Sequence, residues 1–300
     1  MFTSISRFIF PILLLSACTA PIDIDTRDSE PVIVIYGCLT DENRYQSVRI
    51  TSSSPYFDSS ENAAVTDATV RISDSKGRDH DLLHGEDGYY FSDSRFRAYP
   101  GVTYHLVVDV DFDGDGLAET YEATTTLRPA LTVDSIAVKP ISIMGFRHYA
   151  LNIFTQDPPE SQDFYLFRFF INDSISNSRI SSYIVSDDEF FNGSYLENTI
   201  YYFDDATDEN TAGRNREDDN AFLLSPGDRI RLQVSNMEEG YYRFINECTS
   251  EMRGGNPMFG GPPSNISTNV SNGAAGFFTG YCVRETVATV PDYTGFTHLK

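Results

Sequence analysis

The sequence predicts a mainly β protein made of two β-sandwich domains, with one short packed helix near the C-terminus. Apolar and polar residues alternate along several runs, such as residues 68–72 and 104–110, and this period of two is typical of strands with one buried face. Clusters of Gly, Pro, Asp and Ser separate these runs at the spacing of small antiparallel sandwiches. One stretch, at about 238–253, has the periodicity of a helix instead.

The first predicted sandwich occupies residues 32–129. It begins with the β-branched run 32–36, which ends at Gly37 and is typical of a buried strand. Turn-forming sequences divide the later runs at residues 74–77, 85–88 and 100–101. The order of strand and turn sequences resembles the immunoglobulin-like and prealbumin-like modules of exported bacterial proteins, and the segments that carry this resemblance are 68–72, 88–91 and 100–106.

The second predicted sandwich follows Pro129 and occupies residues 130–300. Residues 165–171 are apolar on both alternating faces apart from Arg168, as in a strand at the centre of a sandwich. In the predicted helix, apolar residues recur at intervals of three and four and form one stripe that packs on a sheet. The residues of this stripe are Tyr241, Phe244, Ile245, Cys248 and Met252.

The N-terminal segment has the order of a secretory signal. Arg7 precedes the apolar run 8–15, and the small residues Ser16 and Ala17 precede Cys18. The apolar run is much shorter than the ~20 residues that cross a bilayer, so residues 1–17 are predicted to be a lipoprotein signal peptide. Cys18 is then lipidated, for example with palmitate, and residues 18–31 form a flexible acidic tether. The alternative is an ordinary signal peptide with a chance cysteine.

The charge of the chain restricts its partners. The formal net charge is −22, and removal of residues 1–17 takes away one arginine and no acidic residue, which leaves −23. Such a surface disfavours nucleic acid and repels anionic headgroups. We therefore expect no nucleic-acid partner. We expect attachment through lipid on Cys18, in the outer membrane or at the cell surface.

The segment 111–122 has the ligand spacing of a calcium loop. Acidic residues stand at loop positions one, three, five, nine and twelve, and Gly116 stands at position six. The predicted ligands are Asp111, Asp113, Asp115, Leu117 through its carbonyl, Glu119 and Glu122. Strand-like runs flank the loop where an EF-hand has helices, so the prediction is a Ca²⁺-binding β-hairpin loop. The alternative is a solvated acidic turn, favoured by the turn preference of Asp-Gly.

The cysteines allow little covalent cross-linking of the fold. Three cysteines remain beside Cys18, so at most one internal disulfide forms. Cys248 and Cys282 are the candidates for this disulfide, and two buried thiols are the alternative. Cys38 is expected to be a buried thiol.

We find no nucleophile elbow, zinc-protease motif, phosphate-binding loop or dinucleotide fingerprint. The sequence therefore predicts no catalytic residues.

The order of several motifs resembles one family of unknown function. These motifs are the lipobox at Cys18, Gly37, Ala68-x-Val70-x-Ile72, Gly88-Tyr89-Tyr90, Pro100-Gly101-x-x-Tyr104, Gly227-Asp228, Pro263-x-Asn265-Ile266 and residues 272–278. The chain is similar to domain-of-unknown-function family 4249, an uncharacterised lipoprotein family of Bacteroidota. The resemblance implies an outer-membrane or surface lipoprotein beside a TonB-dependent transporter, and it implies no reaction.

The expected function is therefore binding without catalysis. We expect an accessory lipoprotein that assists a TonB-dependent β-barrel transporter in capturing nutrients or peptides. One alternative is a calcium-stiffened adhesion or structural module of the cell envelope. A second alternative is a hydrolase whose carboxylates meet only in the folded chain.

Overall fold

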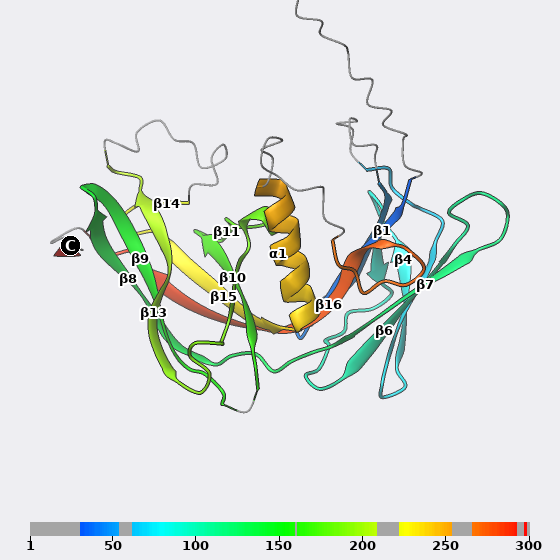
Figure 1. The fold of residues 1–300 in the computed structure, drawn as a ribbon, viewed down its shortest axis with the longest axis horizontal. Helices are drawn as coiled ribbons and strands as arrows, with labels where there is room; N and C mark the ends of the chain where they lie inside the picture. Colours follow the sequence, from blue (N-terminus) through cyan, green and yellow to red (C-terminus); the bar gives the residue numbers. More distant parts are fainter. Residues whose placement is uncertain are drawn as a thin grey trace, which may run out of the picture.

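The computed structural model describes residues 31–53, 62–159, 161–208, 222–253, 266–292 and 297–298. The predicted signal peptide, Cys18 and all but the last residue of the predicted tether lie outside these residues. The described chain forms two sheets and one α-helix, α1 (Glu239–Arg253), together with the short 3-10 helix η1 (Ile180–Ser182). Figure 1 shows α1 in the middle of the molecule, between strands of the N-terminal part on one side and the smaller sheet on the other.

The larger sheet has twelve strands. In chain order they are β1 (Ile33–Thr40), β2 (Ser47–Ser52), β3 (Thr69–Asp74), β4 (Asp79–His84), β5 (Tyr89–Ser92), β6 (Thr103–Val110), β7 (Glu119–Thr126), β10 (Phe164–Ile171), β11 (Ser174–Ile175), β12 (Ile184–Asp187), β15 (Arg229–Met237) and β16 (Ala275–Thr289). Their spatial order is β11-β10-β15-β16-β1-β2-β5-β4-β3-β6-β7, and β12 also pairs with β10.

The smaller sheet has five strands in the order β14-β13-β9-β8-β17. These are β8 (Val133–Ile143), β9 (Phe146–Gln156), β13 (Tyr195–Asp205), β14 (Leu223–Leu224) and β17 (Thr297–His298). The structure confirms the mainly β class and the helix predicted at 238–253. Two separate sandwiches are not confirmed, because the larger sheet runs through both halves of the chain.

A parallel pair of strands joins the two halves. β1 pairs with β16 from Val34 opposite Ala275 to Thr40 opposite Tyr281, although the two strands lie far apart in the sequence. Gly276 makes the close approach feasible: its φ is +98°, and a Cβ there would lie 2.1 Å from the Ile35 carbonyl oxygen. The last long strand therefore completes a sheet that the first strand begins.

Three apolar cores follow from the alternation of side chains along these strands. In β10, Tyr165, Phe167, Phe169 and Ile171 face the core between the two sheets, whereas Phe164 and Leu166 face α1. The predicted apolar character of both faces is thus confirmed. β16 contributes to all three cores. One of its faces covers first the core built mainly from β1 to β7, which we call the N-terminal core, and then the core between the two sheets. Its other face packs on α1.

Candidate ligand-binding site

A small polar hollow of about 290 Å³ lies on the α1 side of the larger sheet, beside the end of β1. Its walls come from β10, β15 and β16, the short strand β11 and the segment that connects β1 to β2. The lining residues are Thr40, Glu42, Arg44, Arg168, Phe170, Ile175, Arg231, Gln233, Tyr281, Val283 and Glu285. We call this hollow the arginine pocket, because its three arginines and two glutamates leave one net positive charge in a chain of charge −22.

The sheet register places the polar side chains of the pocket in rows. Arg168 on β10 pairs with Gln233 on β15, which pairs in turn with Glu285 on β16. In the next row, Phe170 on β10 lies opposite Arg231 on β15. Residues directly opposite one another on the same face of a sheet lie within side-chain reach. Three strands therefore bring distant parts of the sequence to one surface.

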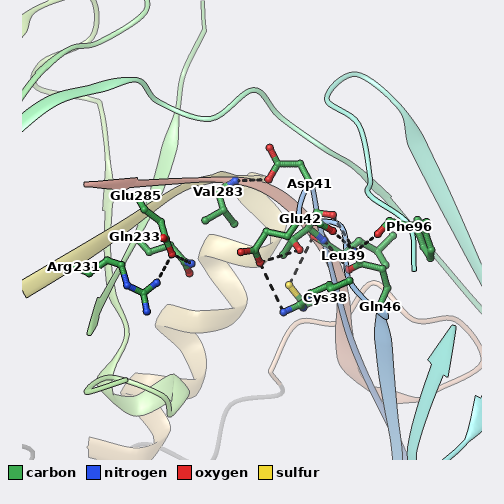
Figure 2. A network of polar contacts seen from close by, with 12 residues as sticks. Cys38, Leu39, Asp41, Glu42, Gln46, Phe96, Arg231, Gln233, Val283 and Glu285 are labelled. Carbon is green, nitrogen blue, oxygen red and sulfur yellow. Dashed lines mark hydrogen bonds and ion pairs between the residues drawn. The ribbon is translucent and has the colours of Figure 1, made fainter. Parts of the chain in front are cut away.

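Arg231 already has an anionic partner in this arrangement. Its Nη1 lies 2.5 Å from Oε1 of Glu285, and the same oxygen accepts a hydrogen bond of 3.1 Å from Gln233 Nε2. The Arg231 guanidinium also stacks on Phe170, with 3.8 Å from Cζ to the ring centre. Figure 2 shows these three polar side chains on one side of the network. Arg231 and Glu285 thus neutralise each other.

Arg168 has no such partner. Its Nε is buried and has no hydrogen-bond partner among the described residues, and its closest described contact with a ring is Tyr183, 5.9 Å from Cζ to the ring centre. Burial raises the pKa of the neighbouring Tyr281 and that of Tyr36 well above the usual value, so both hydroxyls stay neutral. Because a guanidinium does not lose its proton in proteins, Arg168 presents an uncompensated positive charge to the pocket.

The opposite wall of the pocket is held in place by Gln46. This side chain is fully buried; its Oε1 accepts a hydrogen bond from the Thr40 amide, and its Nε2 donates to the carbonyl oxygens of Thr40, Glu42 and Phe96 at 2.9–3.2 Å. Figure 2 shows Gln46 beside Phe96 and Glu42. The segment between β1 and β2 is therefore rigid where Glu42 and Arg44 reach the pocket, and these two side chains are themselves 4.0 Å apart and half-exposed.

The predicted calcium loop connects β6 to β7, and the strand-like runs predicted on both sides of it are these two strands. One carboxylate oxygen each from Asp111, Asp113, Asp115 and Glu119 lies within 4.8 Å of the others. Backbone amides hold these carboxylates: Gly114 and Gly116 donate to Asp111, and Phe112 donates to Glu119 at 2.8 Å. The loop thus gathers four of the predicted ligands without help from another segment.

The other two predicted ligands lie apart from this group. Glu122 pairs with Val107 within the β6–β7 ladder, and its Oε1 lies 3.6 Å from Nε2 of His105. Leu117 is 71% exposed, and its amide donates to Asp115 at 2.8 Å. The geometry therefore differs from that of an EF-hand loop, in which the twelfth residue completes the site. Here β7 begins at Glu119, so Glu122 lies within the strand and not in the loop.

The three described cysteines are all free. Cys248 on α1 packs in the core beneath the helix, whereas Cys282 faces the N-terminal core on the other side of β16. A strand directs consecutive side chains to opposite faces, so the sheet separates these two thiols and the disulfide considered from the sequence is not formed in the structure. Burial raises the pKa of Cys38, that of Cys248 to about 11 and that of Cys282 to about 12. Neutral thiols are poor nucleophiles.

Sequence reasoning missed the arginine pocket. Arg44, Arg168 and Arg231 are separated by more than sixty residues at each step and belong to no shared motif. One signal was present: Arg168 interrupts a strand that is otherwise apolar on both faces, and a charge in such a strand needs a polar environment.

Comparison with known proteins places the chain in a family. The family model described as a domain of unknown function, DUF4249, matches residues 19–286. The chain belongs to this family. The match to DUF4249 includes every residue that lines the arginine pocket and the whole calcium loop. No curated protein matches the chain. Within the described ranges, no helix has the length and apolar character needed to cross a membrane.

Proposed function

We propose that this member of DUF4249 is a non-enzymatic binding protein that captures a small carboxylate-bearing ligand in the arginine pocket. The observation that carries this proposal is Arg168, a largely buried cation without an anionic partner in a pocket wall. Arginine presents donors in a planar fork that matches a carboxylate. A ligand carboxylate would supply the negative charge and the hydrogen-bond acceptors that the described residues leave out.

The pocket also restricts the size and the chemistry of the ligand. Its volume of about 290 Å³ is at the lower end of ligand pockets, roughly 300–1,000 Å³, so it suits a small molecule or one end of a longer one. Phe170 and Ile175 provide an apolar wall, and Glu42 lies half-exposed at the rim. The C-terminal residue of a short peptide combines a carboxylate with an apolar side chain, and its preceding backbone would lead out past Glu42.

Native mass spectrometry with a tripeptide library tests this proposal. We expect peptides with free C-termini to bind at least tenfold more tightly than the same library with amidated C-termini. Arg168→Gln removes the charge and should abolish the preference, and Arg168→Lys should restore it in part, because lysine keeps the charge without the fork. Arg71→Gln is a matched control, since Arg71 on β3 is exposed and pairs with Asp81 on β4. Equal binding of both libraries, or full binding by Arg168→Gln, would exclude the proposal.

We further propose that the protein acts at the outer membrane, anchored through lipid on Cys18, and delivers its ligand to a TonB-dependent transporter. The signal-like N-terminal segment and the membership in DUF4249 support this placement. Palmitate labelling of the full chain should mark the protein and fail in Cys18→Ala. Extraction in mild detergent should recover a β-barrel transporter with it. A protein that remains soluble and unlabelled would contradict the proposed anchor.

A calcium-stiffened adhesion or structural module is the second candidate. The convergence of four carboxylates within 4.8 Å in the β6–β7 loop supports it. Calorimetry with Ca²⁺ should detect a site that is lost in Asp113→Ala/Asp115→Ala and kept in Asp79→Ala/Asp93→Ala, which removes two exposed carboxylates elsewhere in the same half. If the first double variant binds Ca²⁺ with the same stoichiometry as the unmodified protein, this loop is a solvated turn.

A further inference from the structure

A second group of carboxylates is buried where the two sheets meet. Asp157 directly follows β9, Asp163 directly precedes β10, and Asp188 directly follows β12. Their exposed fractions are 0%, 1% and 0%, and one carboxylate oxygen from each lies within 4.8 Å of the others. Charged groups are costly to bury unless they are paired, and three like charges at this distance also repel one another. The protein must therefore compensate for them.

Two of the three carboxylates are held by hydrogen-bond donors. Asp157 accepts hydrogen bonds from the Tyr165 hydroxyl at 2.5 Å and from the Gly193 amide at 2.9 Å. Asp163 accepts from Asn236 at 2.9 Å, and Arg128 Nη2 lies 3.1 Å from the same oxygen. Ser161 also donates to that oxygen at 3.0 Å. These donors satisfy hydrogen-bond acceptors on both groups.

Asp188 is not compensated in this way. Both of its carboxylate oxygens are buried and have no hydrogen-bond partner among the described residues. Its backbone is fixed, because its amide donates to the Asp163 carbonyl at 3.2 Å and its carbonyl accepts from the amides of Phe191 and Asn192 at 2.9 and 2.8 Å. The side chain therefore remains beside Asp157 and Asp163, with both oxygens available to a ligand.

We propose that Asp157, Asp163 and Asp188 bind a divalent cation, with Ca²⁺ as the preferred ion. The three carboxylates that converge here offer hard oxygen, which Ca²⁺ prefers over nitrogen or sulfur. The charges are also complementary, since three carboxylates and the guanidinium of Arg128 sum to −2. Because β9 belongs to the smaller sheet and β10 and β12 to the larger one, the ion would link the two sheets. This site is separate from the arginine pocket and from the β6–β7 loop.

The experiment uses the full chain carrying Asp113→Ala/Asp115→Ala, so that the β6–β7 loop does not contribute. After treatment with a chelator, titration with Ca²⁺ should give one equivalent of binding, and the melting temperature should rise by roughly 5–10 °C at a 100-fold excess over Kd. Asp188→Asn keeps the shape of the side chain and should abolish both effects. Asp79→Asn, at an exposed position, should leave both unchanged.

Terbium luminescence gives a second measurement that needs no change at Asp188. The chain has no tryptophan, and the Tyr165 hydroxyl lies against Asp157, so a Tb³⁺ ion at the site should be excited through this tyrosine and displaced by Ca²⁺. Absence of both Ca²⁺ binding and tyrosine-excited Tb³⁺ emission in the Asp113→Ala/Asp115→Ala chain would overturn the proposal. Asp188 would then be a neutral carboxylic acid, and Asp188→Asn should leave the melting temperature unchanged or raise it at pH 7.

Discussion

Gly276 gives the most direct test of how the two halves of the chain are joined. It lies on β16 opposite Ile35 of β1, at the parallel pair that continues the larger sheet from one half into the other. Its φ of +98° is unfavourable for any residue with a side chain. A Cβ at this position would lie 2.1 Å from the oxygen and 2.8 Å from the carbon of the Ile35 carbonyl. Gly276→Ala must therefore move one strand away from the other.

The expected destabilisation of Gly276→Ala has two contributions. The positive φ costs an alanine roughly 1–2 kcal/mol, and displacement of β1 leaves at least one buried backbone group without its partner, at about 1–3 kcal/mol. We expect Gly276→Ala to lower the free energy of unfolding by roughly 2–5 kcal/mol, out of a total of about 5–15 kcal/mol for a typical protein. Gly273 separates the two contributions, because its φ is +73° but a Cβ there meets nothing within 4 Å. Gly273→Ala should therefore be destabilised only by the cost of the positive φ, roughly 1–2 kcal/mol.

Urea denaturation followed by far-ultraviolet circular dichroism and tyrosine fluorescence measures both variants. We expect one coincident transition with both probes, because β16 contributes to all three cores, and a midpoint for Gly276→Ala well below that of Gly273→Ala. Equal midpoints for the two variants would refute the close approach of β16 to β1. Two separate transitions in the unmodified protein would refute the coupling of the halves through β16.

Three further predictions concern buried polar groups. Gln46→Leu should lower the free energy of unfolding by about 1–3 kcal/mol in urea denaturation, because the Thr40 amide loses its acceptor. The carbonyls of Thr40, Glu42 and Phe96 each lose one donor but keep a backbone amide. An unchanged midpoint would contradict the assigned role of Gln46. Burial alone would raise the pKa of Asp74, but hydrogen bonds from the Arg78 and Lys76 amides and the Arg78 guanidinium outweigh burial and lower it. Its contribution to stability is then present above the unfolded-state pKa and lost as the pH falls through the folded-state pKa, so Asp74→Asn should be less stable than the unmodified protein at pH 7 and equally stable near pH 2; a constant difference across this range would contradict the lowered pKa. Alkylation in denaturant without reductant should modify both Cys248 and Cys282, whereas the native protein at pH 8 should react at neither; unmodified cysteines after unfolding would indicate a disulfide.

The local elements were accessible from the sequence because their signals are local. Alternation over residues 68–72 and 104–110 identified β3 and β6, and the spacing of apolar residues identified α1 to within one residue of its first position. The four carboxylates that meet in the β6–β7 loop lie within one short stretch of sequence, so their spacing along the chain was enough to predict that they converge. Glu122 failed to join them because β7 begins before it, and strand geometry then controls its direction.

Pairing between distant strands was not accessible in this way. Alternation tells which residues share a face, but it does not tell which strand lies beside which. Nothing in residues 33–40 indicates that they pair with residues 275–289, and the prediction of two separate sandwiches followed from reading each half alone. The same limitation applies to Cys248 and Cys282, whose separation by a sheet depends on which face of β16 covers α1.

The sequence by itself determined the mainly β character, the position of the helix, the acidic loop and, through ordered turn motifs, the family. The tertiary structure alone decided the larger sheet shared by both halves, the arginine pocket and the buried aspartates Asp157, Asp163 and Asp188. The physical reason is that backbone preference and side-chain alternation act over a few residues. A binding site, in contrast, depends on which strand ends and faces the long-range packing brings together.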